Sequence, residues 1–464
     1  MKLQFLVLIA LLIISLGFSL IYSTIPPDRD EGTFLAIARE ISKGATLYVD
    51  YADNKPPGIF LFLIPVVWLA GIDILKIRIA AGLVNFLAAI FIYLIGRKLG
   101  NWKMGAVAAV IYIIFINTIG MVGFLLKTET IMNVFICAGS YMLLNSKNNE
   151  KFYFFAGILI ALAGMIRQTA VYAVLLSIYW IWRVEGITIR KYLLLGAGIL
   201  AGILPFLVYL FSKGIINEMI YYTTTGISDV HNLNALGPLT HVSMLYNAIS
   251  SLLLFQILVL MFLAVFGRRK GFEKRGEFVW VWFALSFAFG IISPIANLFF
   301  LMMVAPSLAL LASAGILEIS NEFRELMCGK IKEFPRYVIF SVLLCMIAIW
   351  IVQILLSTVI MVERGAIFEE VVGREDVQYI GGILEKEPGM FYVALVEPQL
   401  YYLFEQRPIT RFPFISPEGY IGIDDWVFKE EIIERLEYER PTYIFFNNKL
   451  SFWKRENDAL VGEL

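Results

Sequence analysis

The sequence is poor in charge, in histidine and in cysteine. Only 16% of its 464 residues are charged, against about 25% in soluble domains, which excludes an ordinary water-soluble enzyme. The formal net charge is zero, so there is no case for binding nucleic acid. Two histidines, His231 and His241, are too few for a histidine-rich metal centre. Cysteines 137, 328 and 345 lie in or beside apolar or basic segments and suggest neither a disulfide framework nor a cysteine-based zinc site.

What the chain has instead is long apolar runs, since 59% of its residues are hydrophobic. A helix that spans a membrane needs roughly 20 apolar residues. The first run is long for a signal peptide and lacks a small-x-small cleavage site, so we interpret it as an uncleaved helix. The sequence predicts an α-helical polytopic membrane protein with about eleven transmembrane helices. They are expected at 3–23, 78–96, 104–121, 128–144, 152–166, 168–182, 191–211, 245–266, 277–295, 297–316 and 337–361.

Lysine and arginine in the connecting segments predict the orientation, because such residues are enriched in cytoplasmic loops. With a cytoplasmic N-terminus, every predicted inner loop is basic, whereas the outer loops carry little positive charge. The inner loops are 97–103, 147–151, 183–191, 268–275 and 324–336. The alternation along the whole chain supports both the helix count and the orientation.

Residues 24–77 are predicted to form one large outer loop. A helix is expected near 31–43, where Phe34, Ile37 and Ile41 share one face. Residues 59–72 are apolar but short for a span, so we expect a helix at the membrane surface. Counting that segment as a span would place the basic loop 97–103 outside and break the charge alternation.

The last hundred residues have a different character, with charged runs and prolines. Helices are expected at 378–386 and 430–437, and buried strands at 391–396 and 443–446. Alternating helices and strands predict a small α/β domain. We therefore divide the chain into a membrane domain, 1–362, and a C-terminal domain, 363–464, which is expected to be extracytoplasmic because it follows an odd number of spans.

Three acids, Asp28, Asp30 and Glu31, follow the first predicted helix and lie close to the outer membrane face. Like charges beside hydrocarbon are costly without partners, which favours a functional role. The alternative is a solvated loop that begins a helix, because acids are favoured near a helix N-terminus.

A second acidic site and two cations lie elsewhere in the outer loops. Glu129 lies in an apolar setting, Lys55 precedes two prolines, and Arg167 stands between two apolar runs. The alternatives are an ion pair for Glu129, with Lys127 or another cation, and membrane-surface positions for Lys55 and Arg167. Together, two acidic sites and two cations suit a lipid phosphate as leaving group and a hydroxyl group as acceptor. If the donor is a sugar, the reaction is a glycosyl transfer.

These segments resemble a known family. The run Asp30-Glu31-Gly-Thr-Phe-Leu-Ala-Ile-Ala-Arg39, followed by Asn54-Lys-Pro-Pro-Gly58, is similar to the first outer loop of the GT-C glycosyltransferases. The likeness is to the family-39-like group, which includes protein O-mannosyltransferases and the aminoarabinose transferase of lipid A. Thr128-Glu129 stands where that group has a second acidic site, Gly164-Met-Ile-Arg167-Gln168 resembles its Gly-x-x-Lys/Arg segment, and residues 397–412 resemble the C-terminal domain of prokaryotic members.

The resemblance implies a GT-C type fold, a polyprenyl-phosphate-linked sugar as donor and a protein, lipid or glycan as acceptor. It implies Asp30 as the catalytic base and Glu31 as an acceptor-binding residue. It gives Glu129 a part in catalysis, by orienting the acceptor or helping to hold a divalent metal. It implies Lys55 and Arg167 as ligands of the donor phosphate. Members differ in their need for metal, so a metal cofactor stays open.

Two other functions are compatible with the sequence. A transporter or flippase of a lipid-linked sugar would need polar or broken helices near the bilayer midplane, often in repeated halves. The charges gather at the outer face instead and no internal repeat is visible, so an enzyme is favoured. A membrane scaffold would leave the pairing of acids with cations unexplained. The long loop 212–244 has no clear counterpart in the family.

Overall fold

The computed structural model describes most of the chain. The residues described are 2–118, 120–225, 253–267, 274–292, 298–327, 334–365, 372–394, 397–413, 426–446, 451–456 and 459–463. Most of loop 212–244, with both histidines, lies outside them, and so does Cys328.

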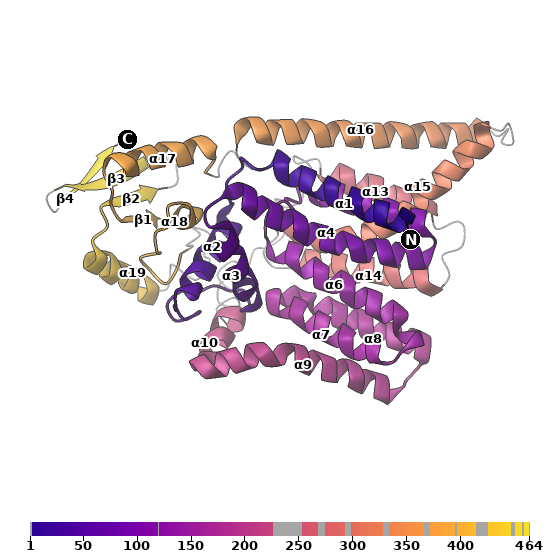
Figure 1. Ribbon diagram of the computed structural model, residues 1–464, viewed down its shortest axis with the longest axis horizontal. Helices are drawn as coiled ribbons and strands as arrows, with labels where there is room; N and C mark the ends of the chain where they lie inside the picture. Colours follow the sequence, from indigo (N-terminus) through magenta and orange to yellow (C-terminus); the bar gives the residue numbers. More distant parts are fainter. Residues whose placement is uncertain are drawn as a thin grey trace.

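Long helices packed side by side form the greater part of the molecule, with α16 along one edge of the bundle and α9 along the other (Figure 1). Their buried faces share one large apolar core. The bundle comprises α1 (Lys2–Ile21), α4 (Ile74–Leu99), α5 (Trp102–Ile116), α6 (Thr128–Asn145), α7 (Lys151–Ile166), α8 (Val171–Glu185), α9 (Ile189–Lys213), α13 (Leu253–Gly267), α14 (Lys274–Ile292), α15 (Ala305–Met327) and α16 (Phe334–Arg364). Short helical turns join some of them: η1 (Ser146–Asn148), η2 (Gln168–Ala170), α10 (Ile216–Ile220), η3 (Tyr221–Thr225) and η4 (Leu298–Val304).

A helix overlaps each segment that was predicted to span the membrane. Residues 119, 245–252, 293–295 and 297 of these segments lie outside the described residues. Within the described residues, five helices are long and apolar enough to cross a membrane by length and composition. They are Lys2–Ile21, Ile74–Leu99, Ile189–Lys213, Leu301–Asn321 and Leu344–Arg364. A mostly helical membrane protein is therefore confirmed, while the count of eleven spans stays a prediction.

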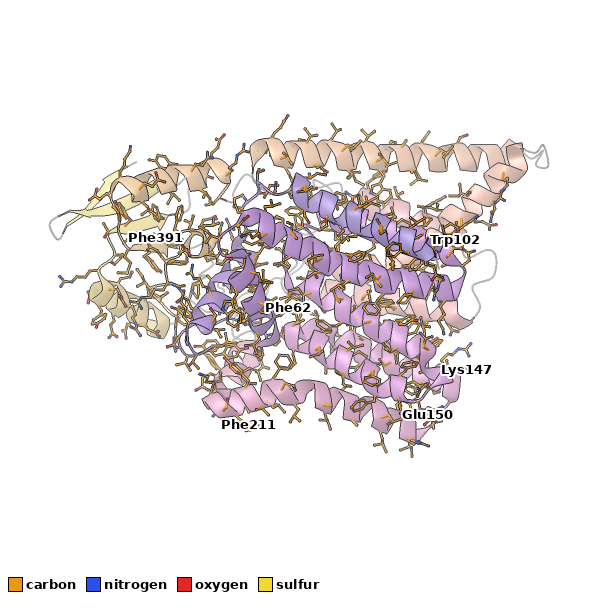
Figure 2. The ribbon with its side chains drawn as sticks, viewed as in Figure 1. Phe62, Trp102, Lys147, Glu150, Phe211 and Phe391 are labelled. Atoms are coloured by element: carbon orange, nitrogen blue, oxygen red, sulfur yellow. The ribbon has the colours of Figure 1, made fainter. Side chains whose placement is uncertain are left out.

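The predicted outer loop forms two helices, α2 (Arg29–Ser42) and α3 (Gly58–Ala70). Both lie across one end of the bundle, and the N-terminus lies at the opposite end (Figure 1). At 13 residues, α3 is short for a span, as expected for a surface helix. Trp102, Lys147 and Glu150 are near the end with the N-terminus, whereas Phe62 and Phe211 are near the end with α2 (Figure 2). Two segments predicted to be cytoplasmic, 97–103 and 147–151, thus lie at the same end as the N-terminus.

The C-terminal part contains helices and a small sheet, as the sequence predicts. All four predicted elements are present, and α18, β3 and β4 were not predicted. The elements are α17 (Arg374–Lys386), β1 (Phe391–Ala394), α18 (Gln399–Leu403), α19 (Trp426–Glu439), β2 (Tyr443–Phe446), β3 (Ser451–Glu456) and β4 (Ala459–Glu463). The strand order is β1-β2-β3-β4; β1 and β2 pair in parallel with Phe391 opposite Tyr443, and the other pairs are antiparallel. The domain boundary at 362/363 stays a prediction.

Helix α2 is held between the bundle and the C-terminal part. The Arg39 guanidinium donates hydrogen bonds to the carbonyl oxygens of Tyr401, Tyr402 and Gln406, at 3.2, 3.3 and 2.6 Å. The two backbones approach closely at Gly32, where an added Cβ would lie 2.2 Å from Cβ of Gln399. The first turn of α2, which carries acids directly before this glycine, is therefore fixed from the C-terminal side as well as from the bundle.

Candidate active site

The first turn of α2 carries the three acids found in the sequence. Asp28 caps the helix, because its carboxylate accepts a hydrogen bond of 2.9 Å from the backbone N–H of Glu31. Asp30 and Glu31 follow in the first turn, where the helix dipole favours negative charge. The helix-start interpretation is therefore correct, and the neighbours of each acid decide what else it does.

Glu31 points into the protein and forms a fully buried ion pair with Arg78 of α4. Both carboxylate oxygens accept from Nη1 of Arg78 at 2.9 Å, and neither side chain has exposed surface. One oxygen also accepts from the N–H of Leu126 at 2.6 Å. Arg78 in turn donates to the carbonyl oxygens of Ile25 and Phe124, at 3.1 and 3.3 Å. Glu31 and Arg78 thus join α2 and α4 to the segment before α6.

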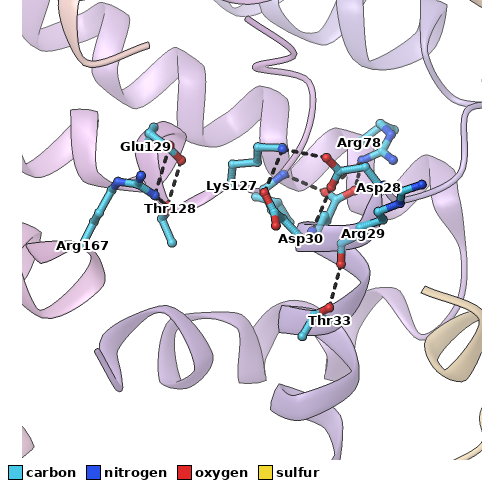
Figure 3. Close-up of polar contacts among 11 residues, drawn as sticks. Asp28, Arg29, Asp30, Thr33, Arg78, Lys127, Thr128, Glu129 and Arg167 are labelled. Atoms are coloured by element: carbon cyan, nitrogen blue, oxygen red, sulfur yellow. Dashed lines mark hydrogen bonds and ion pairs between the residues drawn. The ribbon is translucent and has the colours of Figure 1, made fainter. Parts of the chain in front are cut away.

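Lys127, directly before α6, pairs with the other two acids of the turn. Its ammonium nitrogen lies 2.6 Å from Asp28 and 3.1 Å from Asp30 (Figure 3). The side chains of Lys127 and Asp28 are 2% and 9% exposed, whereas that of Asp30 is 46% exposed. Asp30 is therefore the acid of this turn that a substrate can reach.

Glu129, two residues further on, pairs with Arg167 at the end of α7 (Figure 3). Nη1 of Arg167 lies 3.1 Å from the Glu129 carboxylate and donates to the hydroxyl of Thr128 at 2.7 Å. Thr128 also bonds to Glu129 at 2.8 Å. The partner of Glu129 is thus Arg167, and Lys127 is bound to the α2 acids instead.

The Lys-Pro-Pro turn lies against the end of α7. Asp53 accepts from the N–H of Lys55 at 2.9 Å, and the lysine ammonium bonds to Asn54. The side-chain amide of Gln168 donates to the carbonyl of Asn54 at 2.8 Å. At Gly58 an added Cβ would lie 2.4 Å from a backbone oxygen of α7, so the turn could not come this close with a larger residue. The structure therefore brings the segments of Lys55 and Arg167 together.

Adjacent carboxyl groups differ in acidity here. Burial alone would raise the pKa of Asp30, but the positive charges of Lys127, Lys55 and Arg167 outweigh it and hold the pKa below its usual value. Burial raises the pKa of Glu31, and the charge of Arg78 offsets this only in part. The paired acids raise the pKa of Lys127 despite its burial, so this lysine stays protonated. Asp30 is therefore ionised and able to accept a proton.

The residues described here do not fit a divalent metal ion. Within them, no group of three or more His, Cys, Asp or Glu side chains could hold one. Glu129, the acid that the family resemblance connects with a metal, pairs with Arg167, and Asp30 pairs with Lys127. The negative charge that a metal would neutralise already has a partner.

Each predicted site residue lies at the same end of the molecule, in or beside α2, the Lys-Pro-Pro turn and the adjoining ends of α6 and α7. Their assigned roles stay predictions. Glu31 is the one whose position argues against its assigned role, because a fully buried carboxylate paired with Arg78 cannot touch an acceptor.

Sequence reasoning missed two residues. Arg78 was treated only as the beginning of a span, although an arginine in an apolar helix is itself a signal. Lys127 was considered only as a partner for Glu129.

Comparison with solved structures identifies the fold. ArnT from Cupriavidus metallidurans, solved with bound undecaprenyl phosphate, matches with a TM-score of 0.63 at 12% identity, over 96% of this chain and 93% of that one. Its apo form matches with a TM-score of 0.66 at 12% identity and the same coverage. The oligosaccharyltransferase of Archaeoglobus fulgidus matches with a TM-score of 0.55 at 10% identity, over 94% of this chain and 69% of that one. The chain therefore has the GT-C fold that the resemblance implied.

Comparison by sequence reaches part of the chain. A family model described as dolichyl-phosphate-mannose-protein mannosyltransferase matches residues 54–209, from the Lys-Pro-Pro turn to α9. No curated protein sequence matches the chain. The match includes Lys55, Glu129 and Arg167 but begins after the acids of α2.

Proposed function

We propose that this chain is a membrane glycosyltransferase that moves a sugar from a polyprenyl-phosphate carrier to a hydroxyl group of a protein, lipid or glycan. One observation carries the proposal. Asp30, half exposed and ionised, lies among cations from three separate segments: Lys127 before α6, Lys55 in the outer loop and Arg167 after α7. The fold supports it, because ArnT, which has the same fold, binds undecaprenyl phosphate.

In the proposed reaction Asp30 is the general base. Its carboxylate takes the proton of the acceptor hydroxyl while that oxygen attacks the anomeric carbon of the sugar. The bond from this carbon to the phosphate oxygen breaks, and its electron pair stays on the phosphate. The pKa of Asp30, held low by its neighbours, keeps the carboxylate in its ionised form at neutral pH.

Lys55 and Arg167 bind the donor phosphate and offset the charge that develops on it. The support is their placement: the bond from Gln168 to Asn54 and the close approach at Gly58 hold the two segments against each other. Glu129 fixes the direction of the Arg167 guanidinium, whose planar shape suits a phosphate. Glu31 acts through Arg78, by positioning the turn that carries Asp30.

A transporter of lipid-linked sugars is the alternative function. The arrangement favours the enzyme, because α2, whose first turn carries Asp30, lies across the end of the bundle and not halfway along it (Figure 1).

The decisive experiment is transfer by the purified protein from radiolabelled polyprenyl-phosphate sugars, both hexose and pentose, to a set of hydroxyl acceptors. We expect Asp30→Asn to lower the rate by about 10²–10⁴-fold, the usual contribution of a general base. Asp50→Asn, an exposed acid of the same loop, serves as the matched control and should transfer at the wild-type rate. Full activity of Asp30→Asn in correctly folded protein would remove Asp30 from the mechanism.

We also propose that the active-site end faces the outside of the cell, with a cytoplasmic N-terminus. The basic segments 97–103 and 147–151 lie at the end opposite to α2, which supports this orientation. A cysteine at the exposed position Glu430 in α19 should react with a membrane-impermeant maleimide in intact cells. Protection until the cells are lysed would reverse the orientation.

A further inference from the structure

Lys127 has an unusual position among the cations of the site, because two carboxylates share it. Its ammonium nitrogen lies 2.6 Å from Asp28 and 3.1 Å from Asp30. The lysine side chain is only 2% exposed, so it is largely removed from water. A buried charge is stable only when paired, and two neighbouring carboxylates likewise need a positive charge between them.

The lysine is held in this position by its own backbone. The preceding residue, Leu126, donates its N–H to Glu31, which in turn is bound to Arg78. The carbonyl of Lys127 accepts from Ile131 in the first turn of α6, at 3.3 Å. The backbone that carries Lys127 is therefore fixed on both sides, and it positions the ammonium group beside the α2 acids.

Charged groups from several elements surround Asp30. Lys127 comes from the segment before α6, Lys55 from the outer loop and Arg167 from the end of α7, while Asp28 and Asp53 add negative charge. Lys127 contacts Asp30 directly, at 3.1 Å. A divalent metal bound to Asp28 and Asp30 would have to take the place of this ammonium.

We propose that Lys127 is a built-in counter-cation that takes the place of a divalent metal between Asp28 and Asp30, so that the transfer reaction needs no metal. The statement that sugar transfer needs no metal rests on the proposed function. The exclusion of a metal ion by Lys127 does not, because it is a property of the site itself. The lysine gives up no proton during the reaction. It keeps Asp30 ionised until that carboxylate takes the proton of the acceptor hydroxyl.

The test compares the whole purified protein with its Lys127→Met variant, using Mn²⁺ as the probe and electron paramagnetic resonance to count bound ions. Wild type is expected to bind no Mn²⁺ here and to transfer sugar at the same rate after treatment with EDTA. Lys127→Met leaves two neighbouring carboxylates without their ammonium and should gain a Mn²⁺ site. Adding Asp28→Asn to this variant should remove the site again. Lys147→Met, at the opposite end of the bundle, is the matched control and should behave as wild type.

The pH profile of kcat/KM gives a second readout. The acidic limb of this profile reports the pKa of Asp30. In Lys127→Met it should move up by about one to three pH units, the usual effect of losing one opposite charge beside an aspartate. Lys127→Arg, which keeps the charge, should leave the limb near its wild-type position.

Wild-type activity that EDTA abolishes and Mn²⁺ restores would overturn the proposal, even if Lys127→Met fails to fold. An unchanged acidic limb together with no gain of Mn²⁺ in a folded Lys127→Met protein would overturn it too. If wild type transfers no sugar to any acceptor, the proposed function fails. The Mn²⁺ counts of wild type and variant still decide whether Lys127 excludes the metal.

Discussion

At the end of the bundle that carries α2, the ion pair between Glu31 and Arg78 has no exposed side-chain surface. At the opposite end, the pair between Arg190 and Glu150 leaves 78% and 43% of its side chains exposed. Burying an ion pair removes both charges from water, which often costs as much as the pair gains, whereas an exposed pair costs and contributes little. The difference favours a role other than stability for the buried charged side chains at the α2 end.

Within the α2 end itself, two consecutive acids repeat this contrast. Glu31 is fully buried, with a pKa raised by burial, and Asp30 is 46% exposed, with a pKa lowered by cations. One acid joins helices, and the other is accessible to substrate.

Arg78→Met should lower the free energy of unfolding by about 3–5 kcal/mol, because it leaves Glu31 buried without its partner. Unfolding of the purified protein in detergent, followed by tryptophan fluorescence, measures this loss. The double variant Glu31→Gln/Arg78→Met should recover part of it, since no unpaired charge remains. A single variant as stable as wild type would show that the pair is not what joins α2 to α4.

Lys55→Ala and Arg167→Ala should each lower kcat/KM for the lipid-linked donor by about ten- to a hundredfold, the usual value of a hydrogen bond to a charged group. The KM for the acceptor should change much less. Steady-state kinetics with each substrate varied in turn separates the two effects. Lys43→Ala, which removes a half-exposed lysine of α2, is the control. Equal losses for donor and acceptor would argue against phosphate binding.

Arg190→Ala should have the smallest effect. The pair with Glu150 is exposed at the end opposite to the site, so the free energy of unfolding should fall by less than about 1 kcal/mol and transfer should be unchanged. The same unfolding and transfer assays apply. A loss comparable to that of Arg78→Met would remove the contrast between the two ends.

The sequence predicted much of the fold and the members of the site, but not their pairing. Apolar runs and basic loops placed the helices, and the face shared by Phe34, Ile37 and Ile41 placed α2. The ion pairs could not be predicted because they join segments that are distant in the sequence. Lys127 lies 97 residues from Asp30, and Arg78 lies 47 residues from Glu31. A sequence shows which residues carry charge, but which segments meet depends on packing throughout the bundle.

The C-terminal part shows the same limit. Helices and strands at 378–386, 391–396, 430–437 and 443–446 were predicted, since short apolar runs there alternate with more polar, helix-like segments. The five-residue helix α18 was not, because a helix this short depends on its contacts rather than on its own sequence pattern. Those contacts are with α2, from the other end of the chain.

The bond between Arg29 and Glu397 joins residues 368 positions apart. During synthesis α2 emerges early, and the carbonyl groups that bind Arg39 are made only after the whole bundle. A chain that ended before these residues would lack the contacts of α18 with α2. The site therefore gains its contacts with α18 only after residues 397–406 have been made.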